Sequence, residues 1–339
     1  MNELAAKIKR KAGKIFRSKV VKSDNPVRWG IIGLGYMGET FSTAIDGNRS
    51  GIVAAVGSRS LDKARRFARV HGNCKYYGSY DELIKDQTLD IIYVAVPVEA
   101  HFEIVKKCLE SGQNVLCEKP VTSNAAQLRT LIDLSHSKNL FFMEGMWMKC
   151  LPVYRKASEW IKEGKIGKAQ LVRCDFYKRR VSKSPDSYMG VLKDYGIYAL
   201  SFPLIFGKGE PKVSGHSRFS QEGYDTDWQI NMQFENDITA FVSISSDFSS
   251  ISKAQVIGTD GSIEWESQFN RTDKIVLYDS LGRKIESFNP SYKFEGFEYE
   301  VDEVQKSLRD GRIESELVPL ERSMTALEIM TSLLEARSI

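Results

Sequence analysis

The chain of 339 residues has few of the side chains from which metal sites and disulfide frameworks are built. It contains five cysteines and four histidines, with no C-x-x-C pair and no H-x-x-x-H pair. Such spacings are typical of zinc and redox sites, so the sequence predicts no metal site and no disulfide framework. We therefore expect free thiols, which suit a reducing, cytoplasmic environment.

Long apolar runs are also missing, and none approaches the ~18 residues that a membrane-spanning helix needs. Residues 1–24 lack the apolar core of a secretory signal. They carry eight basic and two acidic residues, which leaves 40 basic and 42 acidic residues in the rest of the chain. Because this remainder is nearly neutral, the sequence argues against a nucleic-acid-binding protein.

Residues 1–25 are predicted to form a separate N-terminal arm. A basic amphipathic helix is indicated by apolar residues at helical spacing between lysines and arginines: Leu4, Ile8, Ala12, Ile15, Phe16 and Val20. Such a helix can make weak contact with an anionic membrane surface. Its narrow apolar face favours the alternatives, in which the arm packs on its own domain or on a partner subunit, or frays.

A glycine-rich turn follows the first predicted strand. The apolar run Val27 to Ile32 leads into Gly33-Leu34-Gly35-Tyr36-Met37-Gly38, and a helix is predicted after it. In a dinucleotide-binding turn, Gly33 would permit the tight bend, Gly35 would let a pyrophosphate approach, and Gly38 would let the helix pack closely. The helix N-terminus would offer N–H groups and partial positive charge to the phosphates. The pattern therefore predicts a nucleotide site.

The end of the second predicted strand, Ile52 to Gly57, indicates which dinucleotide binds. An NAD site places an acidic residue there, whereas this chain has Ser58-Arg59-Ser60, with Lys63 one turn later. Arg59 can pair with a 2′-phosphate and the hydroxyls can donate to it, so NADP(H) is predicted over NAD(H). The alternative is that Ser60 simply caps a helix and the arginine is exposed.

Strands and helices then alternate as far as residue 146, which predicts a doubly wound parallel sheet over residues 26–146. Ligands of such sheets bind at the carboxyl ends of the strands. Besides the glycine turn and Ser58, these ends carry Pro97 with His101, Glu118-Lys119, and Glu144. His101, Glu118 and Glu144 can equally be packing or helix-capping residues.

Residues 147–339 are predicted to form a second, α+β domain with a large open, mostly antiparallel sheet. A helix is expected over Pro152 to Glu163, and two more close the chain. Between them the segments read as strands with turn residues, of which Asn236-Asp237 and Asp260-Gly261 mark hairpins.

Several segments in this order resemble the family of glucose-fructose oxidoreductase and inositol 2-dehydrogenase. They are G-x-G-x-x-G, Pro97-x-x-x-His101, Glu118-Lys119-Pro120 and Asp194-Tyr195-Gly196-Ile197-Tyr198. The dihydrodiol dehydrogenase branch is the most similar, through the segments that run from Met143 to Pro152 and from Asp310 to Ser315. Lys149 and Cys150 depart from that branch, which usually has arginine and phenylalanine there.

The resemblance implies NADP-linked oxidation of a secondary alcohol, or reduction of the matching ketone, without a metal. It implies that Lys119 points into the cleft, that Tyr198 is the acid/base residue and that Asp194 lies beside it. It places Pro97, His101, Glu118 and Lys119 along the cofactor, and Trp147, Phe176 and Tyr177 at a small-molecule substrate, a sugar-like polyol or keto-sugar. It also implies a homo-oligomer.

The chemistry of these residue types agrees with that assignment. A tyrosine is a poor base by itself, but a nearby ammonium favours its phenolate. On a helix, Asp194 and Tyr198 would share a face because they are four residues apart. The structural alternatives are that Lys119 ends a strand, that the tyrosine segment is helix start and core, and that the aromatic residues are core.

Two other functions stay open at this stage. The basic segment 178–183, if it rims the pocket, would suit a nucleotide-linked or phosphorylated sugar, and hence a nucleotide-sugar ketoreductase. It can also be a solvated loop. A protein that binds NADP as a silent sensor or scaffold is the alternative from another class.

Overall fold

The computed structural model describes residues 21–179 and 190–336. Within them the chain forms two compact units. The first takes the residues up to Trp147 together with Tyr292–Leu320, and the second takes Met148–Ser291 and the residues from Glu321 onward. Residues 1–20 of the predicted arm and residues 180–183 of the basic segment lie outside the described residues.

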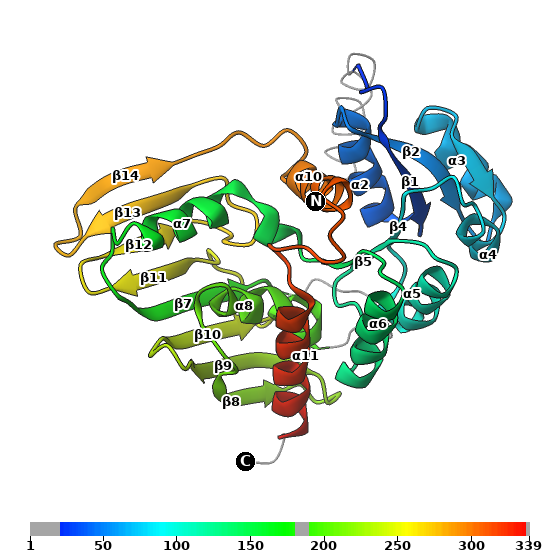
Figure 1. Ribbon diagram of the computed structural model, residues 1–339. Helices are drawn as coiled ribbons and strands as arrows, with labels where there is room; N and C mark the ends of the chain where they lie inside the picture. The colour runs from blue at the N-terminus through cyan, green and yellow to red at the C-terminus, as the bar shows by residue number, and fades with distance from the viewer. Residues whose placement is uncertain (1–20, 180–189, 337–339) are drawn as a thin grey trace. The chain divides into compact units, whose positions relative to one another are not determined.

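The first unit contains a six-stranded parallel sheet in the order β3-β2-β1-β4-β5-β6, which is a Rossmann arrangement (Figure 1). This confirms the predicted doubly wound sheet. The strands are β1 (Val27–Ile32), β2 (Gly51–Gly57), β3 (Lys75–Tyr77), β4 (Ile91–Val94), β5 (Val115–Glu118) and β6 (Phe142–Gly145). The helices between them are α2 (Tyr36–Gly47), α3 (Leu61–Val70), α4 (Tyr80–Ile84), α5 (His101–Glu110) and α6 (Ala125–Ser137).

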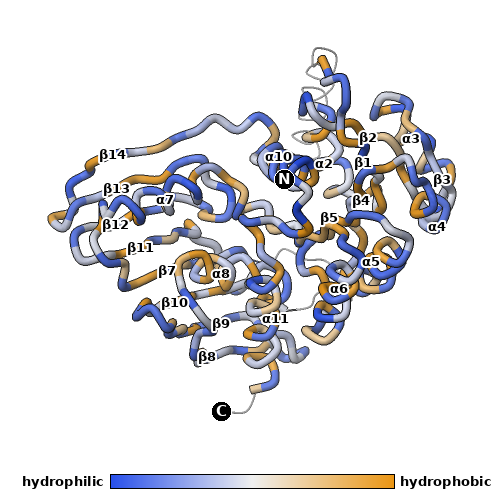
Figure 2. The backbone as a smooth tube through the Cα atoms, viewed as in Figure 1, coloured by the Kyte–Doolittle hydropathy of each residue, from blue (hydrophilic) through white to orange (hydrophobic). Residues whose placement is uncertain are grey.

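The central strands of this sheet are apolar along their whole length. All four residues of β4 are buried, and β1 is buried except at Arg28. Figure 2 shows the corresponding stretches of tube in orange. A strand covered by helices on both faces must be apolar on both faces, which explains why these segments are recognisable as short apolar runs.

The first unit also contains a segment that the sequence placed in the second domain. Helix α10 (Phe297–Arg309) packs beside α2, where Asn48 Nδ2 donates a 2.6 Å hydrogen bond to Asp302 Oδ1 (Figure 1). Further along, Phe142 N donates to Ile313 O at 3.0 Å. The observed division thus differs from a continuous second domain over 147–339. The spacing of apolar residues shows that α10 has a buried face, but not which unit covers it.

The second unit contains an eight-stranded sheet in the order β14-β13-β12-β11-β7-β10-β9-β8. All neighbours pair antiparallel except β7 and β10, which are parallel. The strands are β7 (Ala169–Tyr177), β8 (Lys212–Phe219), β9 (Asp225–Gln233), β10 (Thr239–Ser245), β11 (Ala254–Gly258), β12 (Gly261–Trp265), β13 (Ile275–Asp279) and β14 (Lys284–Phe288). The mostly antiparallel open sheet was predicted. The two edge strands, β8 and β14, were not, because their side chains are largely exposed.

Helices cover one face of this second sheet (Figure 1). They are α7 (Pro152–Lys162), α8 (Ile197–Ser201), α9 (Pro203–Phe206) and α11 (Leu320–Glu335). The Tyr154 hydroxyl of α7 donates to Phe269 O at 2.7 Å, and its ring lies 5.6 Å from Trp265 of β12. Aromatic side chains therefore form the core between this sheet and its helices.

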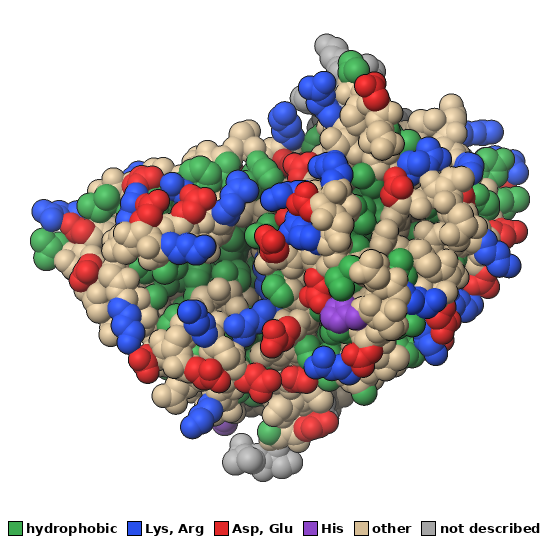
Figure 3. All heavy atoms as spheres, viewed as in Figure 1, with side chains coloured by type: hydrophobic (Ala, Val, Ile, Leu, Met, Phe, Trp, Pro, Cys, Tyr) green, Lys and Arg blue, Asp and Glu red, His purple; other side chains and the backbone are tan. Residues whose placement is uncertain are grey.

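The surface agrees with the near-neutral charge of the chain beyond residue 24. Acidic and basic side chains are interspersed over the face drawn in Figure 3. Among the helices of the described residues, none is long and apolar enough to cross a membrane.

Candidate active site

The glycine turn after β1 has the geometry that its sequence predicts. Gly33 has a φ of +95°, and a Cβ there would lie 2.2 Å from Ala95 O. A Cβ on Gly38 would lie 2.1 Å from Gly33 O, so only glycine lets α2 approach the turn this closely. A Cβ on Gly35 would meet nothing within 4 Å. The backbone at Gly35 is therefore open to an approaching group. At positions 33 and 38, by contrast, close packing requires glycine.

The N-terminus of α2 fits a phosphate. Gly35 is the N-cap residue and carries no side chain that could accept from the first N–H groups. Leu34 is buried, Tyr36 is exposed and Met37 is half-buried. Helix N–H groups left without a side-chain acceptor, at the positive end of the helix dipole, are what a dinucleotide pyrophosphate requires.

At the end of β2, Ser58 and Ser60 form a short hydrogen-bonded turn. Ser58 Oγ accepts from Ser60 N at 3.2 Å, and Ser60 Oγ accepts from Lys63 N at 3.4 Å. Ser60 is thus the N-cap of α3, as the structural alternative predicted. Arg59 and Lys63 are exposed. Asp62, the acidic residue in the first turn of α3, has its Oδ1 3.8 Å from Arg65 Nη2.

His101 links the ends of two neighbouring strands. Its Nδ1 lies 3.0 Å from Pro120 O and its Nε2 lies 2.8 Å from Val96 O. The side chain is buried, and burial lowers the pKa of His101, although its hydrogen bonds to carbonyl oxygens oppose that shift. These contacts support a structural role, in which His101 holds the turn that follows Lys119. The assignment of Pro97 and His101 to the cofactor remains a prediction.

The carboxylate that precedes Lys119 is held by a tyrosine. Tyr93 Oη donates a 2.5 Å hydrogen bond to Glu118 Oε1. Burial raises the pKa of Glu118, while the bond from Tyr93 and the charge of Lys119 act against that increase. Lys119 itself is half-buried, and the Lys119–Pro120 peptide bond is cis. The carboxyl end of β5 thus presents an ammonium beside a hydrogen-bonded carboxylate.

A third carboxyl group at this end of the sheet was not predicted from the sequence. Glu300 of α10 is fully buried, and neither of its carboxyl oxygens has a hydrogen-bond partner. Burial raises its pKa well above the usual value, and the charges of Glu118 and Glu144 raise it further. Burial without a hydrogen-bond partner therefore favours the protonated, neutral form of this side chain. No sequence signal identifies it, because only the return of α10 to the first unit brings it there.

The three aromatic residues assigned to the substrate lie in different surroundings. Trp147 is buried and stacks on Phe297 of α10 at 4.7 Å, which is a packing contact within the first unit. Phe176 of β7 stacks on Tyr198 at 6.2 Å, so it does lie beside the predicted acid/base residue. Tyr177 instead donates a 2.7 Å hydrogen bond to Ser243 Oγ.

Phe176 and Tyr177, both predicted to lie at the substrate, point in opposite directions. Successive residues of a strand point to opposite faces of the sheet, and these two are consecutive in β7. Phe176 therefore faces the helices, where it also contacts Phe269 in an edge-on arrangement. Tyr177 faces the other side, together with Asp175.

Tyr198 follows an unusual helical turn. Residues Leu192–Gly196 form a π-helix that continues directly into α8. Asp194 lies in the π turn and is exposed, whereas Tyr198 lies in α8 and is half-buried. The regular α-helical spacing expected for this pair therefore does not apply. Single π turns inside helices occur frequently at functional sites.

A buried aspartate that the sequence did not single out holds the start of this segment. Asp225 Oδ2 accepts from Leu192 N and from Trp228 Nε1, both at 2.8 Å. Gly190 has a φ of +89°, and a Cβ there would lie 1.7 Å from Asp225 Oδ1, so only glycine fits beside the carboxylate. Asp225 thus fixes the backbone from which Asp194 and Tyr198 project.

The described part of the basic segment adjoins the same aromatic group. Tyr195 Oη donates to Lys178 O at 2.7 Å, and Lys178 Nζ lies 5.8 Å from the centre of the Tyr195 ring. Arg179 N donates to Ser249 Oγ at 2.8 Å. The Tyr195 ring in turn stacks on Phe176 at 5.1 Å.

The candidate catalytic residues belong to different units, Lys119 to the first and Tyr198 to the second. Across residues 21–179 and 190–336 no group of three or more His, Cys, Asp or Glu side chains is arranged to hold a metal ion. All five cysteines are free.

Comparison with protein families matches both units. Residues 27–146 match the GFO/IDH/MocA oxidoreductase family with an NAD-binding Rossmann fold, and residues 154–264 match the GFO/IDH/MocA C-terminal domain. The mouse trans-1,2-dihydrobenzene-1,2-diol dehydrogenase is 31% identical over 90% of this chain and 95% of its own length. The human protein of that name is 29% identical over 91% of this chain and 96% of its own.

Solved structures show the same fold at lower identity. KijD10, a 3-ketoreductase from Actinomadura kijaniata in complex with TDP-benzene and NADP, superposes with a TM-score of 0.78 at 20% identity. The match covers 91% of this chain and 97% of that one. An oxidoreductase from Desulfitobacterium hafniense, described as NADPH-dependent, gives a TM-score of 0.82 at 19% identity, over 93% and 96% of the two chains.

Proposed function

Since the chain belongs to the GFO/IDH/MocA family of oxidoreductases, we propose that it transfers a hydride between NADP(H) and a secondary alcohol or ketone of a sugar-like or cyclic diol substrate. The observation that carries the proposal is the carboxyl edge of the first sheet. There the open backbone at Gly35 and the ammonium of Lys119 lie on the edge at which doubly wound sheets bind their ligands.

The choice of NADP(H) rests on the end of β2. Ser58, Arg59 and Ser60 stand where an NAD site would carry a carboxylate, and Asp62 of the following turn lies against Arg65. A guanidinium pairs with a phosphate through charge-assisted hydrogen bonds. Arg59, together with the Ser60 hydroxyl and Lys63, is therefore the set that would hold the 2′-phosphate.

The bound nicotinamide supplies the carbon that accepts or gives up the hydride. In the proposed reaction Tyr198 Oη takes the proton of the alcohol, or returns one to the carbonyl oxygen. Lys119 is the cation proposed for this reaction, because a positive charge favours a phenolate base and stabilises the oxyanion of the substrate. Phe176, stacked on Tyr198, would hold the ring in position and exclude water. Trp147 and Tyr177 have packing roles in this proposal.

Steady-state kinetics with matched variants test the assignment. The substrate panel should hold neutral keto-sugars, phosphorylated sugars, nucleotide-linked keto-sugars and cyclic trans-diols. We expect Lys119→Met and Tyr198→Phe to lower kcat by at least about 100-fold while NADPH still binds. Tyr195→Phe is the matched control, because it removes the hydroxyl of a neighbouring tyrosine, which donates to the backbone oxygen of Lys178.

Turnover of the Tyr198→Phe protein at the wild-type rate would remove Tyr198 from the mechanism. Tight NADPH binding without turnover of any substrate in the panel would support the silent sensor instead.

A nucleotide-sugar ketoreductase is the second candidate, and one contact favours it. Lys178 lies over the Tyr195 ring, which stacks on Phe176. The first lysine of the basic segment is therefore close to the aromatic residue proposed to contact the substrate. Turnover of nucleotide-linked keto-sugars at least tenfold faster than of neutral ones would support this candidate. Equal rates would favour the neutral substrate.

The expectations of a homo-oligomer, of weak membrane contact through residues 1–24 and of a cytoplasmic location remain predictions. Light scattering of the purified protein measures the first. Vesicle sedimentation of the full chain and of a chain without residues 1–24 tests the membrane contact. The absence of a salt-sensitive difference between the two would reject it.

A further inference from the structure

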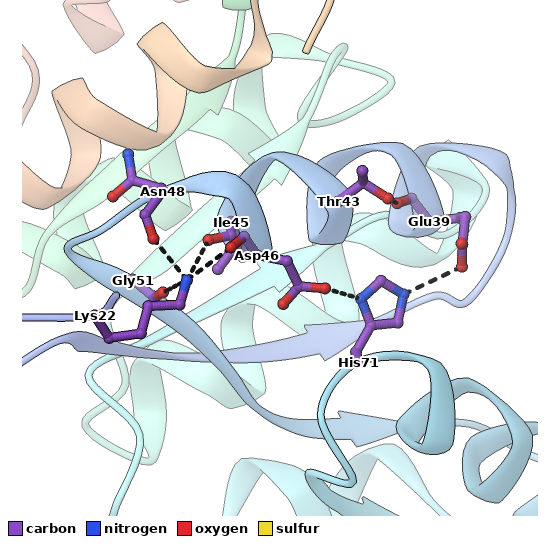
Figure 4. A network of polar contacts seen from close by, with 8 residues as sticks. All are labelled: Lys22, Glu39, Thr43, Ile45, Asp46, Asn48, Gly51 and His71. Carbon is purple, nitrogen blue, oxygen red and sulfur yellow. Dashed lines mark hydrogen bonds and ion pairs between the residues drawn. The ribbon is translucent and has the colours of Figure 1, made fainter. Parts of the chain in front are cut away.

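A buried histidine links the two helices that follow the first two strands (Figure 4). His71, which ends α3, points its ring toward α2. His71 Nδ1 lies 2.7 Å from Asp46 Oδ2, and His71 Nε2 lies 3.2 Å from Glu39 Oε2. The imidazole is completely buried and stacks on the Phe67 ring at 4.4 Å. The contact therefore joins α2 to α3 at a position closed to solvent.

The geometry of this contact favours the charged form of the ring. A carboxylate only accepts hydrogen bonds, and a neutral imidazole has a single N–H. Both ring nitrogens can therefore donate only when His71 is an imidazolium. One positive charge then lies between two negative ones, with both bonds in the charge-assisted class.

The charged and titratable groups around Asp46 differ from those around Glu39. Lys22 lies within electrostatic reach of Asp46, and its Nζ donates to the carbonyl oxygens of residues 45, 46, 48 and 51 at 2.6–3.2 Å (Figure 4). The Cys74 thiol also faces Asp46, and burial together with that carboxylate raises its pKa to about 12. Asp46 thus has a second cation nearby, at the C-terminal end of α2.

Glu39 lies at the other end of α2, in its first turn. It follows Tyr36 by three residues, which is about 4.5 Å of helix. A carboxylate in the first turn stabilises a helix through the helix dipole, but it repels an anion bound at the same N-terminus. That N-terminus is the proposed site of the cofactor pyrophosphate.

We propose that His71 is a positioning residue for the dinucleotide: its imidazolium neutralises Glu39 in the first turn of α2 and holds this helix against α3. The two helices joined in this way are the ones whose N-termini are proposed to hold the pyrophosphate and the 2′-phosphate. The inference rests on the proposed function, because it says that His71 raises the affinity of the proposed NADP(H) site for its anionic ligand.

Titration of the full chain with NADPH tests the inference, with fluorescence as the readout. We expect His71→Gln to weaken NADPH binding about fivefold, since it removes a positive charge that faces Glu39 in the first turn of α2. The double variant His71→Gln/Glu39→Gln should bind within about twofold of wild type, because it removes that charge as well. A purely structural role predicts no recovery of binding, since removing the Glu39 carboxylate does not restore the lost contact between α2 and α3.

Two controls accompany the titration. Lys22→Met removes the cation from the far end of α2, so it should lower the melting temperature but leave the NADPH Kd unchanged. If His71→Gln is too unstable to titrate, wild type and Glu39→Gln are compared at pH 7 and pH 9.5. Wild-type binding should then weaken more with rising pH than binding by Glu39→Gln, because loss of a positive charge facing Glu39 matters only where Glu39 is a carboxylate.

Three results would overturn the inference. They are an unchanged NADPH Kd in a folded His71→Gln protein, a double variant that binds no better than His71→Gln, and equal pH dependence of wild type and Glu39→Gln. Failure of wild type to bind NADPH at all would reject the proposed function itself, and the inference with it. Normal wild-type binding with unaffected variants would reject only the role of His71.

Discussion

Tyr93 Oη donates a 2.5 Å hydrogen bond to Glu118 Oε1, on the strand end that carries Lys119. The tyrosine belongs to β4, and its ring stacks on Phe41 of α2 at 4.2 Å. The donor is therefore held by the core between the sheet and α2. This hydrogen bond orients the carboxylate beside the proposed catalytic lysine. The position of that carboxylate therefore depends on the packing of the Tyr93 ring in the core.

Glu300→Gln is expected to make the protein less sensitive to alkaline pH. The pKa of Glu300 is raised in the folded state, so the folded protein keeps a proton that the unfolded chain releases above its ordinary pKa of about 4.3. Wild-type stability should therefore fall relative to the glutamine variant as pH rises, by about 1.4 kcal/mol per pH unit while folded Glu300 stays protonated.

Urea unfolding at pH 5.5 and pH 7.5 measures this difference. Glu103→Gln, an exposed glutamate on α5, is the control and should show no such trend. A constant difference between wild type and Glu300→Gln at the two pH values would show that Glu300 is ionised in the folded protein.

Alanine substitutions at Gly35 and Gly38 should separate binding from folding. A Cβ on Gly38 would lie 2.1 Å from Gly33 O, so Gly38→Ala must shift the backbone and should destabilise the protein by about 2 kcal/mol or more. A Cβ on Gly35 meets no atom within 4 Å, so Gly35→Ala should keep the wild-type melting temperature. It should still weaken NADPH binding at least about tenfold, because the methyl group fills the space left for the pyrophosphate. Unchanged NADPH binding by Gly35→Ala would place the pyrophosphate elsewhere.

Arg59→Ala should weaken the binding of NADPH but not that of NADH. The loss of a charge-assisted pair with the 2′-phosphate is expected to cost about tenfold or more in the NADPH Kd, and less than about twofold in the NADH Kd. Arg66→Ala, at an exposed arginine of the following helix α3, controls for the general loss of positive charge. Equal losses for the two cofactors would mean that Arg59 does not contact the 2′-phosphate.

Asp225→Ala should destabilise the second unit. The substitution leaves the Leu192 N–H and the Trp228 indole N–H without their acceptor in a buried site, at an expected cost of about 2–4 kcal/mol. Asp225→Asn keeps one acceptor oxygen and should lose less. Circular dichroism melting of the three proteins measures the order, and NADPH binding should be unchanged in all of them. An alanine variant as stable as wild type would remove Asp225 as the support of the π turn.

The local features of the first unit are predictable because neighbours in the chain produce them. The bend at Gly33 and the close approach at Gly38 depend on residues within a few positions, apart from the contact of Gly33 with Ala95. The Ser60 cap is also local. Buried parallel strands such as β4 are recognisable because both of their faces are apolar. The opposite directions of Phe176 and Tyr177 follow from the period of a strand as well, so they too are predictable from the sequence.

The chain by itself thus determined the Rossmann unit, the glycine turn and the basic end of β2, since each depends on residue types at short spacing. Only the tertiary structure decided that α10 returns to the first unit, and with it that Glu300 lies buried near Glu118. It also decided that Asp225 supports the turn at Leu192 and that His71 reaches two carboxylates on α2. These contacts join residues 25 to about 180 positions apart, and such pairs are selected by packing and burial, which a pattern of neighbouring residues does not encode.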